Sequence, residues 1–253
     1  MGHKANKQTI IEHLVEVRNR LVRILAAVLI VFVMLVGFSN DIYSFVAAPL
    51  ATSLPIENTM IATDVTAPFF APFKLTLLVS VFAVIPYILH QCWGFIAPGL
   101  YGTEKRILIP MLVSSIVLFY SGIAFSYYIV FPVIFEFFAS VGPDVIALTP
   151  DISSYLSFVI KMFFAFGIVF EIPIATMLLC WSGITSADDL KKHRPYIVVG
   201  AFAISMLLTP PDVLSQTMLA IPMLVLFELG LIFSKLVTKQ QTDSSDSKAL
   251  SNT

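Results

Sequence analysis

Long apolar runs recur along nearly the whole chain, and short polar segments separate them. A hydrocarbon core about 30 Å thick is crossed by about 20 apolar residues in a helix, so runs of this kind predict membrane-spanning helices. The six predicted spans are Ile24–Phe38, Leu75–Ile96, Ile109–Phe138, Tyr155–Trp181, Tyr196–Leu208 and Val213–Phe233. We therefore expect an all-α polytopic membrane protein.

A charged amphipathic segment leads into the first span without a linker. Its polar positions recur at helical spacing and form one stripe, which comprises His13, Glu16, Arg20 and Arg23. An apolar stripe, which comprises Leu14, Val17, Leu21 and Ile24, lies beside it. The pattern predicts that a carboxylate and several guanidiniums are held at the membrane surface. We expect three parts: a cytoplasmic segment over residues 1–23, a six-helix domain over 24–233 and a disordered tail over 234–253.

Proline positions and helix lengths predict an irregular bundle. Four prolines lie inside predicted spans, where each removes a backbone donor and favours a kink: Pro86, Pro132, Pro173 and Pro222. Kinked helices favour a cupped arrangement over a straight bundle. The last two helices are expected to be short, since Tyr196–Leu208 reaches only about 20 Å as a helix and the returning helix meets Glu228, near the inner surface, fifteen residues after it starts. Such helices either thin the bilayer locally or are buried by partner subunits.

Composition and charge set the compartment and the orientation. The chain is 58% hydrophobic and only 12% charged, with a mean hydropathy of +0.90. Lysines and arginines gather in alternate connecting segments, whereas the opposite segments carry mostly acids. The excess of basic residues on the cytoplasmic side of membrane proteins therefore predicts that both termini are cytoplasmic. We expect a multi-pass membrane protein.

Motifs for common chemistries are missing. The sequence has no GxxxxGK[ST] phosphate loop, no GxSxG and no HExxH, and its four histidines lack metal-ligand spacing. No catalytic residue, metal site or cofactor is predicted, and no nucleic-acid partner. The chain is expected not to be an enzyme.

Glu171 is the most conspicuous charge inside a predicted span. A carboxylate at such depth costs at least about 2.5 kcal/mol unless it is neutral, paired or exposed to a wet cavity. It is interpreted either as an intramembrane polar site or as a protonated, purely structural residue. A proton-coupled secondary transporter of a small solute that uses Glu171 is the alternative function.

Two carboxylates on the cytoplasmic side are candidates for ligand recognition. Glu16 precedes Arg20 by four residues, and spacing alone favours an ordinary helix-surface ion pair between them. Glu104, in the segment between the second and third spans, is followed by Lys105 and Arg106 and has an equally simple explanation. Two separated carboxylates could also each accept a forked guanidinium, a geometry that lysine cannot reproduce.

Several short motifs occur in the same order as in one known family. They are HLVEVRNRL at 13–21, IATD at 61–64, WGFIAPGLY at 93–101, SSYLSF at 153–158, FEIP at 170–173, RPY at 194–196 and LTPPD at 208–212. These motifs resemble TatC, the receptor subunit of the twin-arginine protein translocase, and the resemblance extends in collinear order over roughly residues 10–235. Val17 and Lys105 are mild departures from the family pattern.

The resemblance implies six spans, a cupped structure, cytoplasmic termini and a place in the bacterial inner membrane. It also implies that Glu16 and Glu104 bind the consecutive arginines of signal peptides on folded precursor proteins, with Arg18 and Arg20 in the same recognition region. Transport in this family uses the proton-motive force. The implied partners are single-span TatA-type and TatB-type subunits, further copies of the chain itself and the lipid bilayer.

Further positions take their roles only from the resemblance. Glu171 matches a polar position in the cavity of the family. Met206, Thr209 and Gln216 match a patch that contacts the partner subunits. Pro49, Phe95 and Asp212 match positions that are functionally sensitive in the family.

Overall fold

The computed structural model describes residues 2–53, 60–96, 105–141, 150–182, 184–208 and 213–250. Within these ranges the named elements are all helices, and extended backbone pairing is limited to an isolated bridge between Ile61 and Asp151. The all-α prediction is therefore confirmed. The chain divides into two compact units, which are described separately below.

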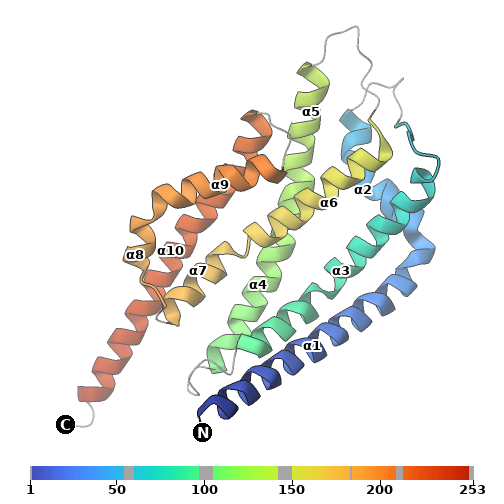
Figure 1. Cartoon of the computed structure of the whole chain (residues 1–253). Helices are drawn as coiled ribbons and strands as arrows, with labels where there is room; N and C mark the ends of the chain where they lie inside the picture. The colour runs from blue at the N-terminus through green and yellow to red at the C-terminus, as the bar shows by residue number, and fades with distance from the viewer. Residues whose placement is uncertain are drawn as a thin grey trace. The chain divides into compact units, whose positions relative to one another are not determined.

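Figure 1 shows the helices in chain order. Their bounds are α1 Gly2–Leu35, the 3-10 turn η1 Val36–Phe38, α2 Ser39–Ser53, α3 Ala67–Ile96, α4 Lys105–Phe125, the π-helix η3 Ser126–Val130, α5 Phe131–Val141, α6 Ile152–Val169, α7 Ile172–Trp181, α8 Ala187–Lys192, α9 Arg194–Leu208 and α10 Val213–Leu250.

Membrane-spanning length is reached five times among the described residues, and a shorter apolar helix is also present. The long spans are Leu14–Leu50, Ala67–Phe95, Ile109–Phe138, Ile152–Trp181 and Ser215–Lys235, and the short helix is Arg194–Leu207. This agrees with the predicted six. The first span is longer than expected, because the helix resumes as α2 after the turn Val36–Phe38.

One of the two predicted short helices is not short. The 15 residues of α9 reach about 22 Å, as expected. However, the apolar part of α10, Ser215–Lys235, has 21 residues, which reach about 31 Å. The prediction treated Glu228 as the approach to the inner surface, whereas its pairing with Arg194 lets the span continue past it. The tail expected to be disordered also differs, since α10 is helical to Leu250 over a stretch that contains no Gly or Pro.

Only some of the intramembrane prolines interrupt a helix. The π-helix Ser126–Val130 comes just before Pro132, and a turn at Phe170–Glu171 precedes Pro173. In contrast, α3 continues through Pro86 and α10 through Pro222. Neighbouring helices and local changes of hydrogen bonding allow membrane helices to tolerate proline in this way.

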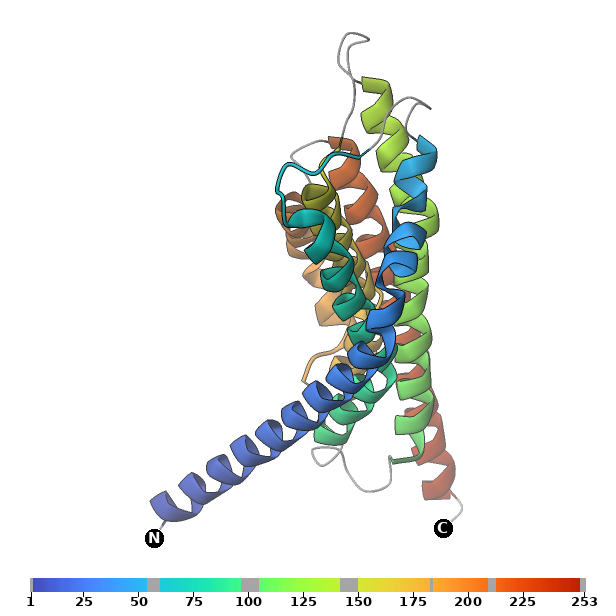
Figure 2. The ribbon, with the colours of Figure 1, turned by 90° about the vertical axis from the view of Figure 1, so that its right-hand side faces the viewer.

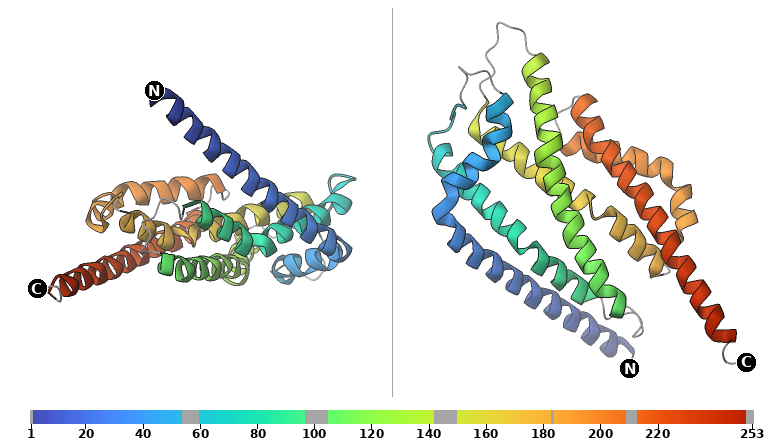
Figure 3. Two further views of the ribbon diagram at one scale, coloured as in Figure 1. Left: turned by 90° about the horizontal axis from the view of Figure 1, so that it is seen from below. Right: turned by 180° about the vertical axis from the view of Figure 1, so that it is seen from behind.

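The first unit comprises residues 1–48, 60–116 and 151–156, and it is built on α1 and α3, which lie side by side. Buried apolar side chains of α3, among them Ala71, Leu75 and Leu78, form its core. The N-terminal half of α1 diverges from α3, as two further views show (Figures 2 and 3). The polar residues of α1 near this divergence are therefore accessible, while its next turns meet α3.

Polar contacts join the start of α6 to the residues that precede α3 within this unit. The Asp151 carboxylate accepts hydrogen bonds from the backbone and hydroxyl groups of Thr63, at 3.1 and 2.8 Å, and of Ser154, at 2.9 and 3.1 Å. These bonds stabilise the charged form and lower the pKa of Asp151 to about 2. The Tyr155 hydroxyl donates a buried hydrogen bond to the carbonyl of Val46 in α2 at 2.8 Å.

The second unit comprises residues 49–59, 117–150 and 157–253, and aromatic side chains fill part of its core. The Phe131 ring lies 5.5, 6.1 and 5.2 Å from the rings of Phe135, Phe158 and Phe163. Elsewhere in the unit, α7 packs closely against α10, whose Gly230 makes the approach possible. A Cβ atom at Gly230 would meet the Thr176 side chain and lie 2.9 Å from the Cα atom of Pro173.

Candidate functional site

Glu16 and Arg20 lie on the part of α1 where the helix passes from polar to apolar surroundings. Their i, i+4 spacing places them on one face, as the polar stripe predicts. Arg20 Nη2 lies 2.6 Å from Glu16 Oε1, and Nε donates to the same oxygen at 3.0 Å. The ion pair expected from spacing is therefore present, and Glu16 binds a guanidinium through two N–H groups.

Arg20 also reaches across to the end of α3. Its Nη1 donates to the carbonyl oxygen and to the side-chain Oε1 of Gln91, both at 3.1 Å, and its Nη2 donates to the carbonyl of Gly94 at 3.1 Å. Gln91 is buried, with 7% of its surface exposed, whereas the side chains of Arg20 and Glu16 are 23% and 37% exposed. Glu16, Arg20, Gln91 and Gly94 are called the Arg20 cluster below.

The other predicted members of the recognition region are placed differently. Arg18 is exposed on α1 and is not among the residues that bind Arg20. Glu104 lies outside the described residues, as does the side chain of His13. Among the predicted signal-binding residues within the described ranges, the structure thus brings together Glu16 and Arg20.

Glu171 lies where the long fourth span is interrupted. It is the residue before α7, with φ −79° and ψ −11°, and its carbonyl accepts from the amide of Ala175 at 2.9 Å. The side chain is half-buried. The interruption follows from Pro173, which cannot donate to the preceding turn. The predicted intramembrane polar site therefore coincides with a break in helical structure.

Two of the three predicted partner-contact residues lie near the end of α9 and the start of α10. Met206 is 64% exposed on α9, while Gln216 on α10 donates through Nε2 to the carbonyl of Phe202 at 3.1 Å. Thr209 and Asp212 lie outside the described residues. Of the other sensitive positions, Pro49 lies inside α2 and Phe95 near the end of α3, both half-buried.

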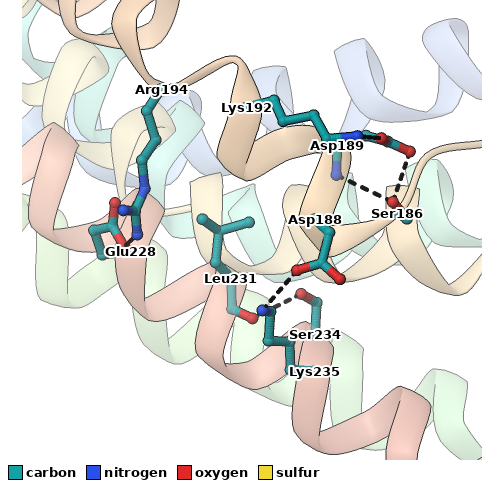
Figure 4. A network of polar contacts seen from close by, with 9 residues as sticks. All are labelled: Ser186, Asp188, Asp189, Lys192, Arg194, Glu228, Leu231, Ser234 and Lys235. Atoms are coloured by element: carbon teal, nitrogen blue, oxygen red, sulfur yellow. Dashed lines mark hydrogen bonds and ion pairs between the residues drawn. The ribbon is translucent and has the colours of Figure 1, made fainter.

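A second group of charges lies around α8 (Figure 4). The α8 cluster comprises Ser186, Asp188, Asp189, Lys192, Arg194, Glu228 and Lys235. Lys235 of α10 binds Asp188 at 2.8 Å, and Lys192 binds Asp189 at 3.0 Å. Arg194 pairs with Glu228, so α9 is joined to α10 as well.

The short helix α8 begins with a serine cap. Ser186 accepts a hydrogen bond from the backbone amide of Asp189 at 3.1 Å and donates to its carboxylate at 2.6 Å. The hydrogen bond from Lys235 lowers the pKa of Asp188, and those from Ser186 and Lys192 lower the pKa of Asp189. The Asp189 carboxylate in turn raises the pKa of Lys192. These groups stay ionised at neutral pH; the Asp188–Lys235 pair joins α8 to α10, whereas the Asp189–Lys192 pair lies within α8.

Sequence reasoning did not identify Gln91 and Gly94 as ligands of Arg20. A signal was present, because Gln91 is a polar residue inside a predicted span, near the end that is predicted to be cytoplasmic, and it lies one helical turn from a glycine. The Arg194–Glu228 pair was also missed. Its residues are 34 positions apart, so no helical spacing relates them.

Comparisons with known proteins give a consistent result. A family model described as Sec-independent protein translocase protein (TatC) matches residues 12–222. The Sec-independent protein translocase protein TatC of Haemophilus influenzae is 55% identical over 97% of this chain and 96% of its own length. Its counterpart in Escherichia coli strain K12 is 56% identical over 90% of this chain and 88% of its own length.

The fold is similar to a solved structure as well. A crystal structure of a twin arginine translocase receptor, TatC, matches with a TM-score of 0.79 and 38% sequence identity. The match covers 89% of this chain and 99% of that chain. Sequence and fold therefore agree over almost the whole length.

Proposed function

The chain belongs to the TatC family of Sec-independent protein translocase proteins, and we propose that it is the receptor that binds twin-arginine signal peptides at the cytoplasmic face of the bacterial inner membrane. Both termini are cytoplasmic in this proposal. The chain performs no catalytic step of its own. Family membership favours this function over a proton-coupled solute transporter.

One observation carries the proposal: the Glu16 carboxylate binds a guanidinium through two N–H groups. A carboxylate in this setting can accept the side chain of a substrate arginine in the same forked geometry. Glu104 provides the second carboxylate, so that each arginine of the pair has its own acceptor. Arg18 and Arg20 belong to the same recognition region.

The strength of such recognition is adequate for a receptor. A hydrogen bond to a charged group contributes about 1.5–3 kcal/mol, so two guanidinium sites supply roughly 3–6 kcal/mol if their effects add. That corresponds to about a hundred- to ten-thousand-fold preference over a signal without arginines. Screening by salt lowers these figures, because Glu16 is partly exposed.

The remaining predicted sites belong to assembly and transport. TatA-type and TatB-type subunits contact the chain around Met206, Thr209 and Gln216, and several copies of the chain associate. Glu171 is a polar site within the membrane, along the path of the transported protein. The proton-motive force drives this transport. Pro49, Phe95 and Asp212 are positions where substitution impairs export.

The test is crosslinking of the full chain to a twin-arginine signal peptide that carries a photoreactive group. Glu16→Gln combined with Glu104→Gln removes both negative charges and should abolish the crosslink. Glu136→Gln, on an exposed carboxylate of α5, is the matched control and should leave the crosslink intact. Undiminished crosslinking in the double variant would exclude this mode of recognition.

A further inference from the structure

Arg20 is bound more completely than a helix-surface ion pair requires. A guanidinium has five N–H donors, and each of them is used in the Arg20 cluster: Nε binds Glu16, Nη1 makes two bonds to Gln91, and Nη2 bonds to Glu16 and Gly94. Four acceptor atoms on two helices thus surround one cation. An exposed i, i+4 pair needs only the carboxylate.

The acceptors on α3 are fixed in place before any ligand arrives. The Gln91 side chain is buried, so its amide oxygen is held in position. Gly94 lies in the last turn of α3, where carbonyls lack partners within the helix and the helix dipole favours a cation. A Cβ atom at position 94 would lie 2.9 Å from Arg20 Nη1, so the absence of a side chain leaves room for the guanidinium.

We propose that Glu16, Gln91 and the Gly94 carbonyl form the binding site for one arginine of the signal peptide, and that Arg20 is a resident competitor that occupies this site until the peptide displaces it. The inference rests on the proposed function and extends it by naming the remaining ligands and the occupant of the unloaded site.

Exchange of one guanidinium for another conserves the contacts. The same five hydrogen bonds re-form with the incoming arginine, so the swap leaves no buried acceptor without a donor. Arg20 and Glu16 are partly exposed, which gives the peptide access and lets Arg20 rotate into water. A lysine has three N–H donors without the planar fork and cannot satisfy the same acceptors, so the site discriminates against a lysine pair.

A resident competitor lowers the apparent affinity by the fraction of time that the site is open. If Arg20 occupies the site about nine-tenths of the time, its removal tightens binding about tenfold, which is about 1.4 kcal/mol. An arginine that only orients Glu16 has the opposite effect, because its removal weakens binding. The two roles therefore differ in sign.

The experiment measures affinity of the full-length protein in lipid nanodiscs for a fluorescent twin-arginine signal peptide and for its twin-lysine version. Arg20→Ala should bind the twin-arginine peptide about tenfold more tightly than the parent. Arg23→Ala is the matched control, because it removes the same charge from the same helix at an exposed position outside the cluster. It should change the affinity for the peptide less than about threefold, because its charge acts on the peptide only through screened long-range electrostatics.

A second variant shows whether the peptide uses the same acceptors. In the Arg20→Ala background, Gln91→Leu removes an acceptor from the peptide and should weaken binding about fivefold. In the parent, Gln91→Leu weakens Arg20 and the peptide together, so the change should be smaller than twofold. Equal effects in both backgrounds would overturn the exchange.

Failure of the inference is distinguishable from failure of the proposed function. A parent protein that binds both peptides equally contradicts the proposed function itself. A parent that prefers arginine, with Arg20→Ala binding no more tightly than Arg23→Ala, overturns only the competitor role. If thermal melting shows that Arg20→Ala is unfolded, Arg20→Lys replaces it, with about threefold tighter binding expected and unchanged or weaker binding as the contradicting result.

Discussion

The Arg20 cluster and the α8 cluster use the same kinds of side chain in different ways. In the Arg20 cluster one guanidinium faces four acceptor atoms, two of them on a buried glutamine, and its side chain is 23% exposed. In the α8 cluster each carboxylate has one cation of its own, and the side chains of the lysine pairs are 50–77% exposed. Several acceptor groups from two helices converge on one cation in the first cluster, whereas each carboxylate has its own cation in the second.

This difference separates a site that can exchange its ligand from a site that only holds elements together. Matched, exposed pairs contribute little stability and offer no free acceptor to a third party. Fixed acceptors that converge on one exchangeable cation are a preorganised binding site. Burial of the acceptors, rather than the number of charges, therefore distinguishes a cluster that binds a ligand from a cluster that only joins helices.

Among substitutions in the α8 cluster, Glu228→Gln is expected to have the largest effect on thermal stability. The substitution leaves the Arg194 guanidinium without its carboxylate at a position where both side chains are a little over 40% exposed. Solvent reduces the loss to about 1 kcal/mol, or about 2–4 °C in the melting temperature. Thermal melting in detergent measures this change.

The comparison predicts that Glu228→Gln leaves twin-arginine peptide affinity unchanged, whereas Glu16→Gln weakens it about tenfold or more. The Glu136→Gln variant again serves as the control for loss of one carboxylate. Equal loss of peptide affinity in the Glu16 and Glu228 variants would break the distinction between the clusters.

A smaller effect is expected from Asp188→Asn, which removes the partner of Lys235. The pair is largely exposed, so water replaces its contacts and the melting temperature should change by no more than about 1 °C. Amide hydrogen exchange of residues 187–192 should rise locally, because a tie between α8 and α10 is lost. A fall of several degrees would show that the pair stabilises the whole unit.

The smallest effect at neutral pH is expected from titration of the aspartates in the α8 cluster. Asp188 and Asp189 have pKa values below the ordinary 3.8, so their stabilising contribution is complete above that value and is lost as the pH falls through the lowered values. Between about pH 5 and 8 no change is expected.

Carbon-13 carboxyl shifts of labelled aspartates measure these pKa values directly. Lys235→Gln should return the pKa of Asp188 toward 3.8, because the hydrogen bond from Lys235 is the main cause of the lowered pKa of Asp188. The pKa of Asp189 should not change. Lys192→Gln should act on Asp189 instead. Titration of Asp188 at 3.8 in the parent would contradict the contact.

Sequence patterns predict the helices well, because apolar runs in a membrane protein are dictated by the bilayer. They predict helix ends poorly. The prediction ended the first span at Phe38 because the polar residues Ser39, Asn40 and Asp41 follow it, yet these residues form the first turn of α2 after one 3-10 turn. The length of α10 was missed because a glutamate was counted as a boundary, and its arginine partner lies on another helix.

Only part of the candidate site could be predicted from the sequence. Glu16 and Arg20 are related by helical spacing, so their pairing could be predicted from one helix. Gln91 and Gly94 lie more than 70 positions from Arg20 and contribute backbone carbonyls, which every residue has. Contacts of this kind depend on how two helices pack, and no local pattern encodes them.

The position of Arg20 four residues from Glu16 has a consequence for selectivity among competing cations. A tethered ligand acts at a high effective concentration, in the millimolar range for short connections. Free arginine and other small cations at lower concentrations cannot compete with it for Glu16. Only a ligand that gains binding energy elsewhere, from a second arginine or an adjoining apolar segment, can displace it. The tether thereby makes the receptor respond to bivalent ligands and ignore monovalent ones.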